Sequence, residues 1–451
     1  MEELLHEKRK VLIVGLGKTG LSCARYLAAQ NVEVAITDSR KHPPEVDVLL
    51  KELPDTALFL GRFDEQVFES AEELIVSPGI SLHEPVIATA VERGVPVAGD
   101  IELFAKASTA PVIAITGSNG KSTVTSLVGM MAREDQRDVR VGGNIGVPAL
   151  DLIQEQEPDL YVLELSSFQL ESTRSLNASV AAVLNVSPDH MDRYDNVDEY
   201  TAAKHRVFNG DGVMVLNADD ERVMAMQRPE REIIYFGVEN HNRAQDQDGF
   251  IADEYDGQIW LCRGKERLIR QSELRIVGKH NLSNALAALA IGEAAGFSRE
   301  SMVRALRTFS GLPHRTQWVA EQDNIRWYND SKATNVGATI AALQGMDGKV
   351  VLIAGGDSKG ADFSPMVEAV KANARAVILI GQAAPGLRGV LVGAAQLIDA
   401  ENMTDAVEKA RENAKDGDCV LLSPACASFD MYKNYEQRGD VFMDAVRSLL
   451  S

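Results

Sequence analysis

The chain has 451 residues, 45% of them hydrophobic and 25% charged, a normal globular composition with enough apolar material for several cores. Its formal net charge of −20 argues against non-specific binding to nucleic acid, whose phosphates would repel it. The N-terminus lacks the apolar core of a signal peptide, no stretch approaches the ~18 apolar residues that span a bilayer, and the four cysteines show no paired spacing, so we expect a reduced, cytoplasmic protein without a membrane segment.

The first hundred residues alternate short apolar segments with helical patterns. Buried parallel strands are predicted at residues 10–14, 32–37 and 73–76. Gly15-Leu-Gly-Lys-Thr-Gly20 follows the first strand and Asp38 ends the second, which is similar to the GxGxxG dinucleotide fingerprint with its downstream acid. The glycines also suit close packing of a helix on a strand, so the motif alone is weak. Because an ATP loop follows in the next domain, we favour a nucleotide-linked substrate here over NAD.

A second series of strands and helices opens with the apolar segment 111–116. Further strands are predicted at residues 159–164, 180–186 and 212–217. The polar, Gly- and Asp-rich segment 240–275 contains one short apolar stretch and suggests a hairpin. Residues 279–296 show a strong Ala- and Leu-rich helical pattern.

The segment Thr116-Gly-Ser-Asn-Gly-Lys-Ser-Thr123 lies between the first of these strands and an amphipathic helical pattern. Glycines let backbone N–H groups curl around phosphate oxygens, Lys121 is placed to reach the β- and γ-phosphates, and the hydroxyl of Ser122 is placed to hold Mg²⁺. The full pattern GxxxxGK[ST] would have Gly where Ile115 stands, so this is a tightened variant. Its strand–loop–helix context favours a phosphate-binding loop over a simple turn at a helix start.

Polar residues follow the next two strands, at the ends where open α/β sheets place their ligands. Glu164 ends one strand, and Asn185, Asp189 and His190 follow the other. A carboxylate beside a phosphate loop is a natural ligand of Mg²⁺, which binds few carboxylates together with phosphate oxygens and water. Taken alone, His190 is more simply a loop histidine. Lys204 lies in a helical pattern and, taken alone, is more simply a solvated surface group.

A third series of alternating strands and helices begins near Leu312. Strands are predicted at residues 325–328, 350–354, 376–380 and 419–422. Two of them are followed by lysine-bearing turns, Asp330-Ser-Lys-Ala-Thr-Asn335 and Gly355-Gly-Asp-Ser-Lys-Gly360, which suggest recognition of a phosphate or an incoming carboxylate. The small-residue loop 423–430 suits hydrogen bonds to a compact polar ligand, and we expect its Cys426 to be a packed residue rather than a nucleophile.

Alternation of strand and helix throughout predicts parallel sheets covered by helices. We therefore expect an α/β protein of three domains. These are a Rossmann-like N-terminal domain over residues 1–99, a central P-loop mononucleotide-binding ATPase domain over 100–311, and a C-terminal Rossmann-like α/β domain over 312–451.

Eight motifs in chain order resemble those of the Mur ligases of peptidoglycan synthesis. They are TGSNGKST, ELSSFQLE, NVSPDHMDR, KHNLSNALAA, GLPHR, NDSKATN, GGDSKGADF and SPACASFDMYKNYEQRG. The resemblance runs essentially end to end and implies an ATP-dependent ligase that activates a carboxylate as an acyl phosphate and couples it to an amine. Within the family, the last motif and the GLGKTG start point to addition of D-glutamate to UDP-N-acetylmuramoyl-L-alanine. We expect a monomer.

The resemblance also implies a set of functional residues. The phosphates of ATP would be bound by Gly117, Ser118, Asn119, Gly120, Lys121, Ser122 and Thr123. ATP would also be contacted by Asn281, Arg315 and Asp330, the last through the ribose. Two Mg²⁺ ions would be held by Ser122, Glu164, His190 and a carbamate on Lys204. The UDP-linked substrate would be bound by Thr19, Asp38, Ser39, Arg40, Gly79 and Asn144. D-glutamate would be bound by Lys332, Thr334, Lys359, Ser428 and Tyr435.

Two positions depart from the family pattern. Tyr435 stands where Phe is frequent, and Ser358 replaces the usual glycine of GGDGKG. Either difference would alter the affinity for the amino acid modestly without changing the reaction. Selectivity for D- over L-glutamate rests on the resemblance and not on the residues themselves.

Three other functions fit parts of the sequence. Folylpolyglutamate synthase, a ligase of the same superfamily, lacks an N-terminal domain of the GLGKTG type. An NAD-dependent dehydrogenase would account for residues 11–38 but would leave TGSNGKST unexplained. A P-loop switch protein, which binds nucleotide to control a partner, would release no phosphate with all candidate substrates present.

Overall fold

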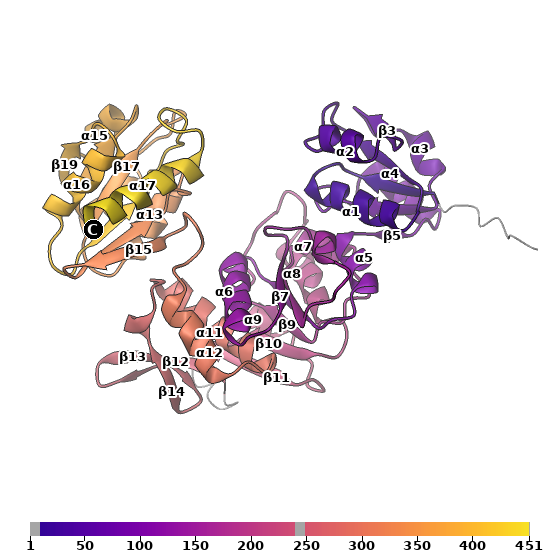
Figure 1. Cartoon of the computed structure of the whole chain (residues 1–451), viewed down its shortest axis with the longest axis horizontal. Coiled ribbons are helices and arrows are strands. Elements are labelled where there is room, and N and C mark those ends of the chain that lie inside the picture. The colour runs from indigo at the N-terminus through magenta and orange to yellow at the C-terminus, as the bar shows by residue number, and fades with distance from the viewer. Residues whose placement is uncertain (1–9, 240–248, 451) are drawn as a thin grey trace, which may run out of the picture. The chain divides into compact units, whose positions relative to one another are not determined.

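The computed structural model describes residues 10–239 and 249–450 and contains three β-sheets (Figure 1). The chain divides into two compact units. The first comprises residues 1–269 and 284–305, and the second comprises residues 270–283 and 306–451. No helix within the described residues is both long enough and apolar enough to cross a membrane.

The first sheet has five parallel strands in the order β3-β2-β1-β4-β5. They are β1 (Val11–Val14), β2 (Val34–Asp38), β3 (Ala57–Leu60), β4 (Glu73–Val76) and β5 (Val97–Ala98). Its helices are α1 (Lys18–Ala29), α2 (Val46–Glu52), α3 (Glu65–Glu69), α4 (Pro85–Glu92) and α5 (Asp100–Ala107). Alternate residues of β1 enter different cores, Ile13 on the α1 side and Leu12 on the α3–α4 side, as expected of a strand covered on both faces.

The second sheet has nine strands in the order β14-β13-β12-β11-β10-β9-β6-β8-β7. They are β6 (Val112–Thr116), β7 (Val139–Gly143), β8 (Leu160–Glu164), β9 (Val180–Val183), β10 (Val213–Asn217), β11 (Ile233–Gly237), β12 (Phe250–Tyr255), β13 (Gln258–Arg263) and β14 (Glu266–Arg270). The helices that follow are α6 (Lys121–Glu134), α7 (Ser167–Glu171), α8 (Val197–His205), α9 (Glu221–Met224), α11 (Lys279–Ala294) and α12 (Arg299–Thr308).

The hairpin expected within 240–275 is present as β12 and β13, which pair antiparallel. Asp256 and Gly257 connect these strands, and both have positive φ, as a tight hairpin turn requires. Residues 240–248 of the predicted segment lie outside the described residues.

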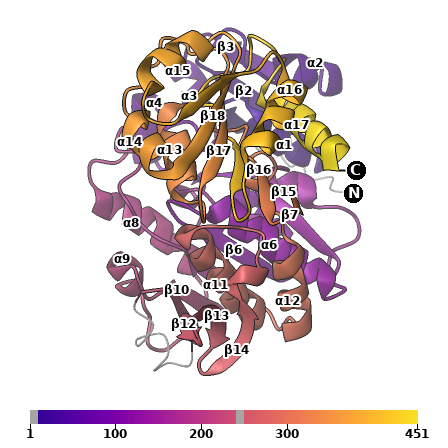
Figure 2. The same ribbon diagram turned by 90° about the vertical axis from the view of Figure 1, so that its left-hand side faces the viewer.

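The third sheet has six strands in the order β15-β16-β20-β17-β18-β19, parallel except for β15. They are β15 (Gln317–Gln322), β16 (Ile325–Asn329), β17 (Val350–Gly355), β18 (Ala374–Ile380), β19 (Gln396–Asp399) and β20 (Cys419–Leu422). Its helices are α13 (Val336–Gln344), α14 (Met366–Asn373), α15 (Ala384–Leu391), α16 (Met403–Asn413) and α17 (Tyr435–Leu450). One face packs on α13, α14 and α15 and the other on α16 and α17, and α16 lies beside α17 (Figure 2).

These three sheets confirm the expected α/β architecture, with Rossmann-like first and third sheets and a central sheet that carries the phosphate loop. The domain boundaries at residues 99 and 311 remain predictions.

Candidate active site

The predicted phosphate loop occupies the four residues between β6 and α6, the context that the motif requires. Gly120 caps α6 with a φ of +83°, a left-handed conformation that glycine adopts without strain. A Cβ on Gly120 would lie 2.3 Å from the side-chain oxygen of Asn284, and one on Gly117 would lie 3.0 Å from Cβ of Leu184. Both glycines are therefore required by close packing as well as by the curl of the loop.

Asn185, just after β9, forms hydrogen bonds to the backbone of the phosphate loop. Its side-chain oxygen accepts from the backbone N–H of Asn119 at 2.8 Å, and its amide donates to the carbonyl of the same residue at 3.1 Å. The hydroxyl of Ser118 donates to the carbonyl of Ser187 at 3.0 Å. These bonds fix the loop before any ligand arrives, which lowers the cost of binding.

Two lysines converge on the carbonyl of Gly117. The ammonium of Lys121 donates to it at 2.8 Å and to the carbonyl of Ser118 at 2.9 Å, and the ammonium of Lys204 donates to it at 2.9 Å. Lys204 is buried, with 1% of its surface exposed, and its ammonium lies 4.4 Å from the centre of the Tyr200 ring. The simplest reading of Lys204, a solvated surface group, is therefore wrong.

The environment of Lys204 favours its neutral form. Burial first, and then the charge of Lys121, lower its pKa to about 7, against a partial offset from Asp189 and Glu164. At neutral pH a large fraction of the amine is therefore uncharged and nucleophilic.

Glu164 ends β8 and is 2% exposed. One carboxylate oxygen accepts from the side-chain amide of Asn144 at 2.7 Å, and the backbone N–H of Asn144 donates to the carbonyl of Glu164 at 2.8 Å. The other carboxylate oxygen is buried and has no hydrogen-bond partner among the described residues. Burying half a carboxylate without a partner is costly, and a divalent cation would supply the missing partner.

The protein contributes few metal ligands of its own at this point. In the described part of the chain, no cluster of three or more His, Cys, Asp or Glu side chains is arranged to hold a metal. His190 is half-exposed, with its ring 4.7 Å from that of Phe168 and its Nε2 3.5 Å from Asp189. This donor set fits Mg²⁺, which keeps waters and phosphate oxygens, and does not fit a metal held by protein ligands alone.

Five of the six residues predicted for the UDP-linked substrate lie at the carboxyl ends of β1, β2 and β4: Thr19 in the first turn of α1, Asp38 at the end of β2, Ser39 and Arg40 after it, and Gly79 after β4. The sixth, Asn144, follows β7 in the second sheet. Asp38 is buried and accepts from the backbone N–H of Leu16 at 2.8 Å and from the guanidinium of Arg40 at 2.8 and 2.6 Å. Burial would raise the pKa of Asp38, but these donors outweigh it and lower the pKa. Asp38 thus joins the glycine loop to the loop after β2.

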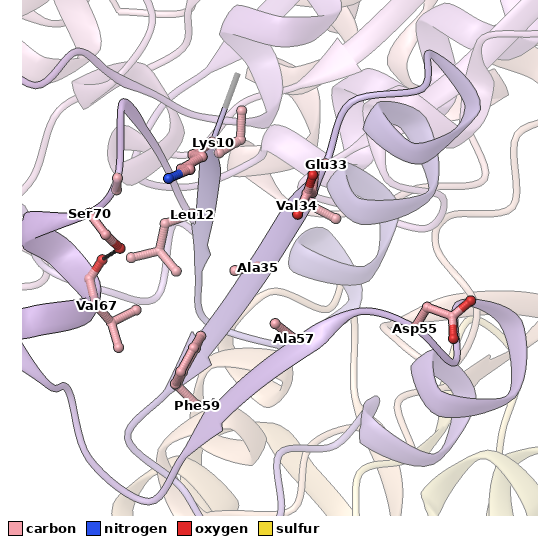
Figure 3. A pocket seen from close by; sticks show the side chains of 12 residues that line it. Lys10, Leu12, Glu33, Val34, Ala35, Asp55, Ala57, Phe59, Val67 and Ser70 are labelled. Atoms are coloured by element: carbon pink, nitrogen blue, oxygen red, sulfur yellow. Dashed lines mark hydrogen bonds between the residues drawn. The ribbon is translucent and has the colours of Figure 1, made fainter. Parts of the chain in front are cut away.

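A separate pocket lies over the opposite ends of β1, β2 and β3, where Leu12, Ala35, Ala57 and Phe59 line it (Figure 3). It lies at the amino ends of the strands, whereas open α/β sheets bind ligands at the carboxyl ends. The residues predicted for the UDP-linked substrate therefore lie away from this pocket.

In the third sheet, three loops follow the carboxyl ends of the adjacent strands β16, β20 and β17. These loops and the start of α17 carry the residues predicted for D-glutamate: Lys332, Thr334, Lys359, Ser428 and Tyr435. Asp357 and Ala427 exchange backbone hydrogen bonds of 2.9 Å, which joins the Lys359 loop to the Ser428 loop. The ammonium of Lys332 lies 5.8 Å from the centre of the Tyr435 ring. The structure therefore gathers all five residues at one end of this sheet.

The three other residues predicted to contact ATP, Asn281, Arg315 and Asp330, lie in the second unit. Asp330 is 5% exposed and accepts from the Ser423 hydroxyl at 2.8 Å and the Thr316 backbone N–H at 3.0 Å, while burial raises its pKa to about 6. Arg315 stands between two non-glycine residues with positive φ, His314 at +59° and Thr316 at +44°. Such strain clusters at functional sites. The amide of Asn281 donates to the carbonyl of Val277 at 2.9 Å.

Three family models match consecutive parts of the chain. "Mur ligase MurD-like, N-terminal domain" matches residues 9–99, "Mur ligase middle domain" residues 115–292, and "Mur ligase, glutamate ligase domain" residues 314–426. The UDP-N-acetylmuramoylalanine–D-glutamate ligase of Nitrosococcus oceani is 55% identical over 98% of this chain and 97% of its own. The chain belongs to the Mur ligase family.

Other relatives agree with this membership. Enzymes of the same name from Marinobacter nauticus and Pseudomonas aeruginosa are 51% and 49% identical, over 98% and 97% of this chain and 98% of each of theirs. A solved structure of UDP-N-acetylmuramoyl-L-alanyl-D-glutamate–2,6-diaminopimelate ligase matches 85% of this Mur ligase and 94% of its own chain, with a TM-score of 0.61 at 20% identity. The UDP-N-acetylmuramate-alanine ligase of Thermotoga maritima matches 98% and 99%, with a TM-score of 0.55 at 18% identity. Both structures share the fold.

As a Mur ligase, the protein is an ATP-dependent enzyme that forms an amide bond and uses Mg²⁺. This confirms the expected ligase and leaves the dehydrogenase and the switch protein without support.

The structure of this Mur ligase also brings in residues that the sequence alone did not single out. His314 is buried and its Nδ1 lies 3.0 Å from the Asn329 amide, and Arg438 is buried beside the lysine loops. Both residues lie within motifs that resemble the family, His314 in GLPHR and Arg438 in KNYEQRG, but neither was given a role, since their contacts are with residues distant in sequence. Burial raises the pKa of Cys426 to about 12, in line with a packed residue that is no nucleophile.

Proposed function

We propose that this Mur ligase joins D-glutamate to UDP-N-acetylmuramoyl-L-alanine at the expense of ATP, in the cytoplasmic stage of peptidoglycan synthesis. Identity of 55% to a D-glutamate ligase over nearly the full length of both chains is the observation that carries the proposal. The geometry adds a pre-formed phosphate loop and a group of cationic side chains at the end of the third sheet, which suits a dicarboxylic amino acid.

The phosphate loop performs the first half of the reaction. An oxygen of the substrate carboxylate attacks the γ-phosphorus of ATP, and ADP leaves with the electron pair of the broken bond, which gives an acyl phosphate. Lys121, at the start of α6, neutralises charge on the transferring phosphoryl group, assisted by the positive end of the helix. The D-glutamate amine then attacks the acyl carbon, and phosphate leaves with one former carboxylate oxygen.

Glu164, His190 and Ser122 would hold Mg²⁺. Glu164 offers the partnerless buried oxygen, and Asn144 fixes its orientation. Bound there, the ion supplies positive charge to the phosphate oxygens. A second ion would need an additional anionic ligand, and Lys204 is the side chain placed to become one.

We assign a carbamate to Lys204. The amine is buried and its pKa is lowered to about 7, so a large fraction is neutral near that pH, as addition to CO₂ requires. An unmodified ammonium at this point would repel divalent cations, whereas the carbamate carries a negative charge that would attract them. The sign of the charge at Lys204 therefore decides whether two ions are bound.

We assign the substrates to residues near the carboxyl ends of the strands. Thr19, Asp38, Ser39, Arg40, Gly79 and Asn144 would bind the UDP-linked substrate, and Asn281, Arg315 and Asp330 would contact ATP, the last through the ribose. Lys332, Thr334, Lys359, Ser428 and Tyr435 would bind D-glutamate. Arg40, half-exposed and charged, suits the diphosphate. The protein acts as a monomer in this proposal.

The proposal is tested by measuring ADP release with UDP-N-acetylmuramoyl-L-alanine and one amino acid at a time. D-glutamate should support turnover, and L-glutamate, meso-diaminopimelate and L-lysine should not. Turnover with another of these amino acids and none with D-glutamate would overturn the assignment of the substrate while leaving the ligase chemistry in place.

A further inference from the structure

Arg438 is a buried cation whose partners are all neutral. It lies in the first turn of α17 with 2% of its surface exposed. Within the described residues its guanidinium makes four hydrogen bonds, and all go to carbonyl or hydroxyl oxygens. Burial lowers the pKa of Arg438 to about 10, so the guanidinium stays charged at neutral pH. Burying a charge is costly unless its donors are satisfied, so the position needs a reason beyond packing.

The guanidinium joins the loops that end the central strands of the third sheet. Nε and Nη2 donate to the hydroxyl and carbonyl of Ser331 at 2.9 and 2.8 Å. Nη1 donates to the carbonyls of Cys426 and Ala427 at 3.1 and 3.2 Å. A Cβ on Gly356 would lie 3.2 Å from Nη1, so the third loop also passes directly beside the guanidinium.

Each of these contacts is next to a residue proposed to bind the amino acid. Ser331 precedes Lys332, Ala427 precedes Ser428, and Gly356 lies in the loop that carries Lys359. The hydroxyl of Ser331 in turn donates to the carbonyl of Tyr435 at 2.8 Å. One guanidinium thus bonds two of these loops, contacts the start of α17 through Ser331, and lies beside the third loop.

Two of the loops hold strained backbone. Ala425 has a φ of +59° and Lys359 a φ of +48°, which side chains other than glycine rarely adopt. Such conformations persist only where the surroundings over-determine them. Arg438 helps to hold the strained backbone at Ala425, because it binds the carbonyls of the two residues that follow.

We propose that Arg438 is a positioning residue for the amino acid, which fixes the three loops and contributes a buried positive charge that favours a dicarboxylate. The proposal rests on the proposed function, since it takes these loops as the D-glutamate site. The planar geometry of the Arg438 guanidinium matters as well as its charge, because its nitrogens must bind several oxygens in different directions at once.

The test compares Michaelis constants for the three substrates in Arg438→Lys and Arg438→Met. Lysine keeps the charge but reaches fewer of the oxygens, so the KM for D-glutamate should rise by about tenfold or more. Methionine also removes the charge, so Arg438→Met should raise the KM for D-glutamate further. The KM for ATP and for the UDP-linked substrate should stay within about twofold, a split that a general loss of folded protein would not produce.

Arg447→Lys is the matched control, since Arg447 is on the same helix, is largely exposed and pairs with Asp444. Arg447→Lys should leave the Michaelis constants for all three substrates unchanged. If the Arg438 variants fail to fold, Ser331→Ala decides, because it removes one acceptor and should raise the KM for D-glutamate several-fold. An unchanged KM for D-glutamate in the folded variants, or an equal rise for all three substrates, would overturn the proposal. Absence of turnover with D-glutamate in the unaltered protein would instead overturn the proposed function.

Discussion

Burial is the first cause of the pKa shifts at several residues of the predicted site. Lys204 and Arg438 have lowered pKa values, and that of Asp330 is raised, each because the charged form is taken out of water. The shift has different consequences in each case. The lowered pKa makes Lys204 a nucleophilic amine, whereas Arg438 stays charged at neutral pH. The raised pKa of Asp330 means that its ionised form destabilises the folded protein.

Lys204→Arg should abolish nearly all activity while the protein stays folded, because arginine keeps the positive charge and cannot form this carbamate. After equilibration with labelled bicarbonate, ¹³C NMR should show a carbamate resonance in the unaltered protein and none in the variant. The resonance should weaken as the pH falls below about 7, since protonation of Lys204 removes the reactive amine. A fully active variant and no resonance would contradict the carbamate.

Asp330→Asn should stabilise the protein and weaken ATP binding. The pKa of Asp330 rises from 3.8 to about 6 on folding, so its contribution to stability is present below 3.8 and is lost as the pH rises through about 6. At about pH 7.5 the substitution removes a penalty on the order of 3 kcal/mol, and at about pH 4 it changes little. Urea midpoints at the two pH values check this. A variant that is less stable at the higher pH would show that the buried carboxylate stabilises the fold.

At the scale of elements, the segment between β9 and α8 links the first sheet to the predicted metal ligand. Arg193 donates to the carbonyl of Pro78 at 3.0 Å and pairs with Glu171 at 2.5 Å. Its guanidinium lies 4.4 Å from the centre of the Phe168 ring, and the same ring contacts His190. Pro78 precedes Gly79, so one arginine touches both the substrate loop and the ring beside His190.

Arg193→Met should therefore raise both the KM for the UDP-linked substrate and the Mg²⁺ concentration for half-maximal activity, each by about tenfold, because the buried pair with Glu171 is lost. Steady-state kinetics at varied Mg²⁺ measure both. Arg222→Met serves as the control, since Arg222 pairs with Asp198 in an exposed position. A change in one constant alone would show that the two sites are not linked through Arg193.

The elements that sequence predicted best are the buried parallel strands. β1, β6, β8 and β17 are fully buried and mostly apolar, and the observed bounds agree with the expected ones within two residues. β3, β15 and β19 were missed because they are edge strands with half-exposed side chains, whose patterns resemble loops. The phosphate loop was found because its chemistry is local in sequence. The burial of Lys204 and the hydrogen bonds of Arg438 and Asn185 arise from residues distant in sequence, so no local pattern reveals them.

At the scale of the whole molecule, the proposed phosphate loop and the residues proposed for the uridine diphosphate belong to different sheets. Lys121→Ala should reduce ligation by at least about a hundredfold, because a charge-assisted contact to the transferring phosphoryl group is lost. Binding of the UDP-linked substrate, measured by calorimetry, should stay close to normal. Asp38→Ala should show the reverse, a raised KM for the UDP-linked substrate and little change for ATP, since Asp38 holds the glycine loop of the first sheet. An effect of Asp38→Ala on ATP instead would contradict this division.

The activation of a carboxylate by ATP is the claim on which the rest depends, and transfer of a heavy oxygen isotope tests it most directly. UDP-N-acetylmuramoyl-L-alanine labelled in both carboxylate oxygens is turned over with ATP and D-glutamate, and the released nucleotide and phosphate are analysed by mass spectrometry. The acyl phosphate route predicts one labelled oxygen in inorganic phosphate and the other in the amide of the product. Label in AMP would mean attack at the α-phosphorus, and phosphate without label would mean that ATP hydrolysis is not coupled to the carboxylate; either result would contradict the account.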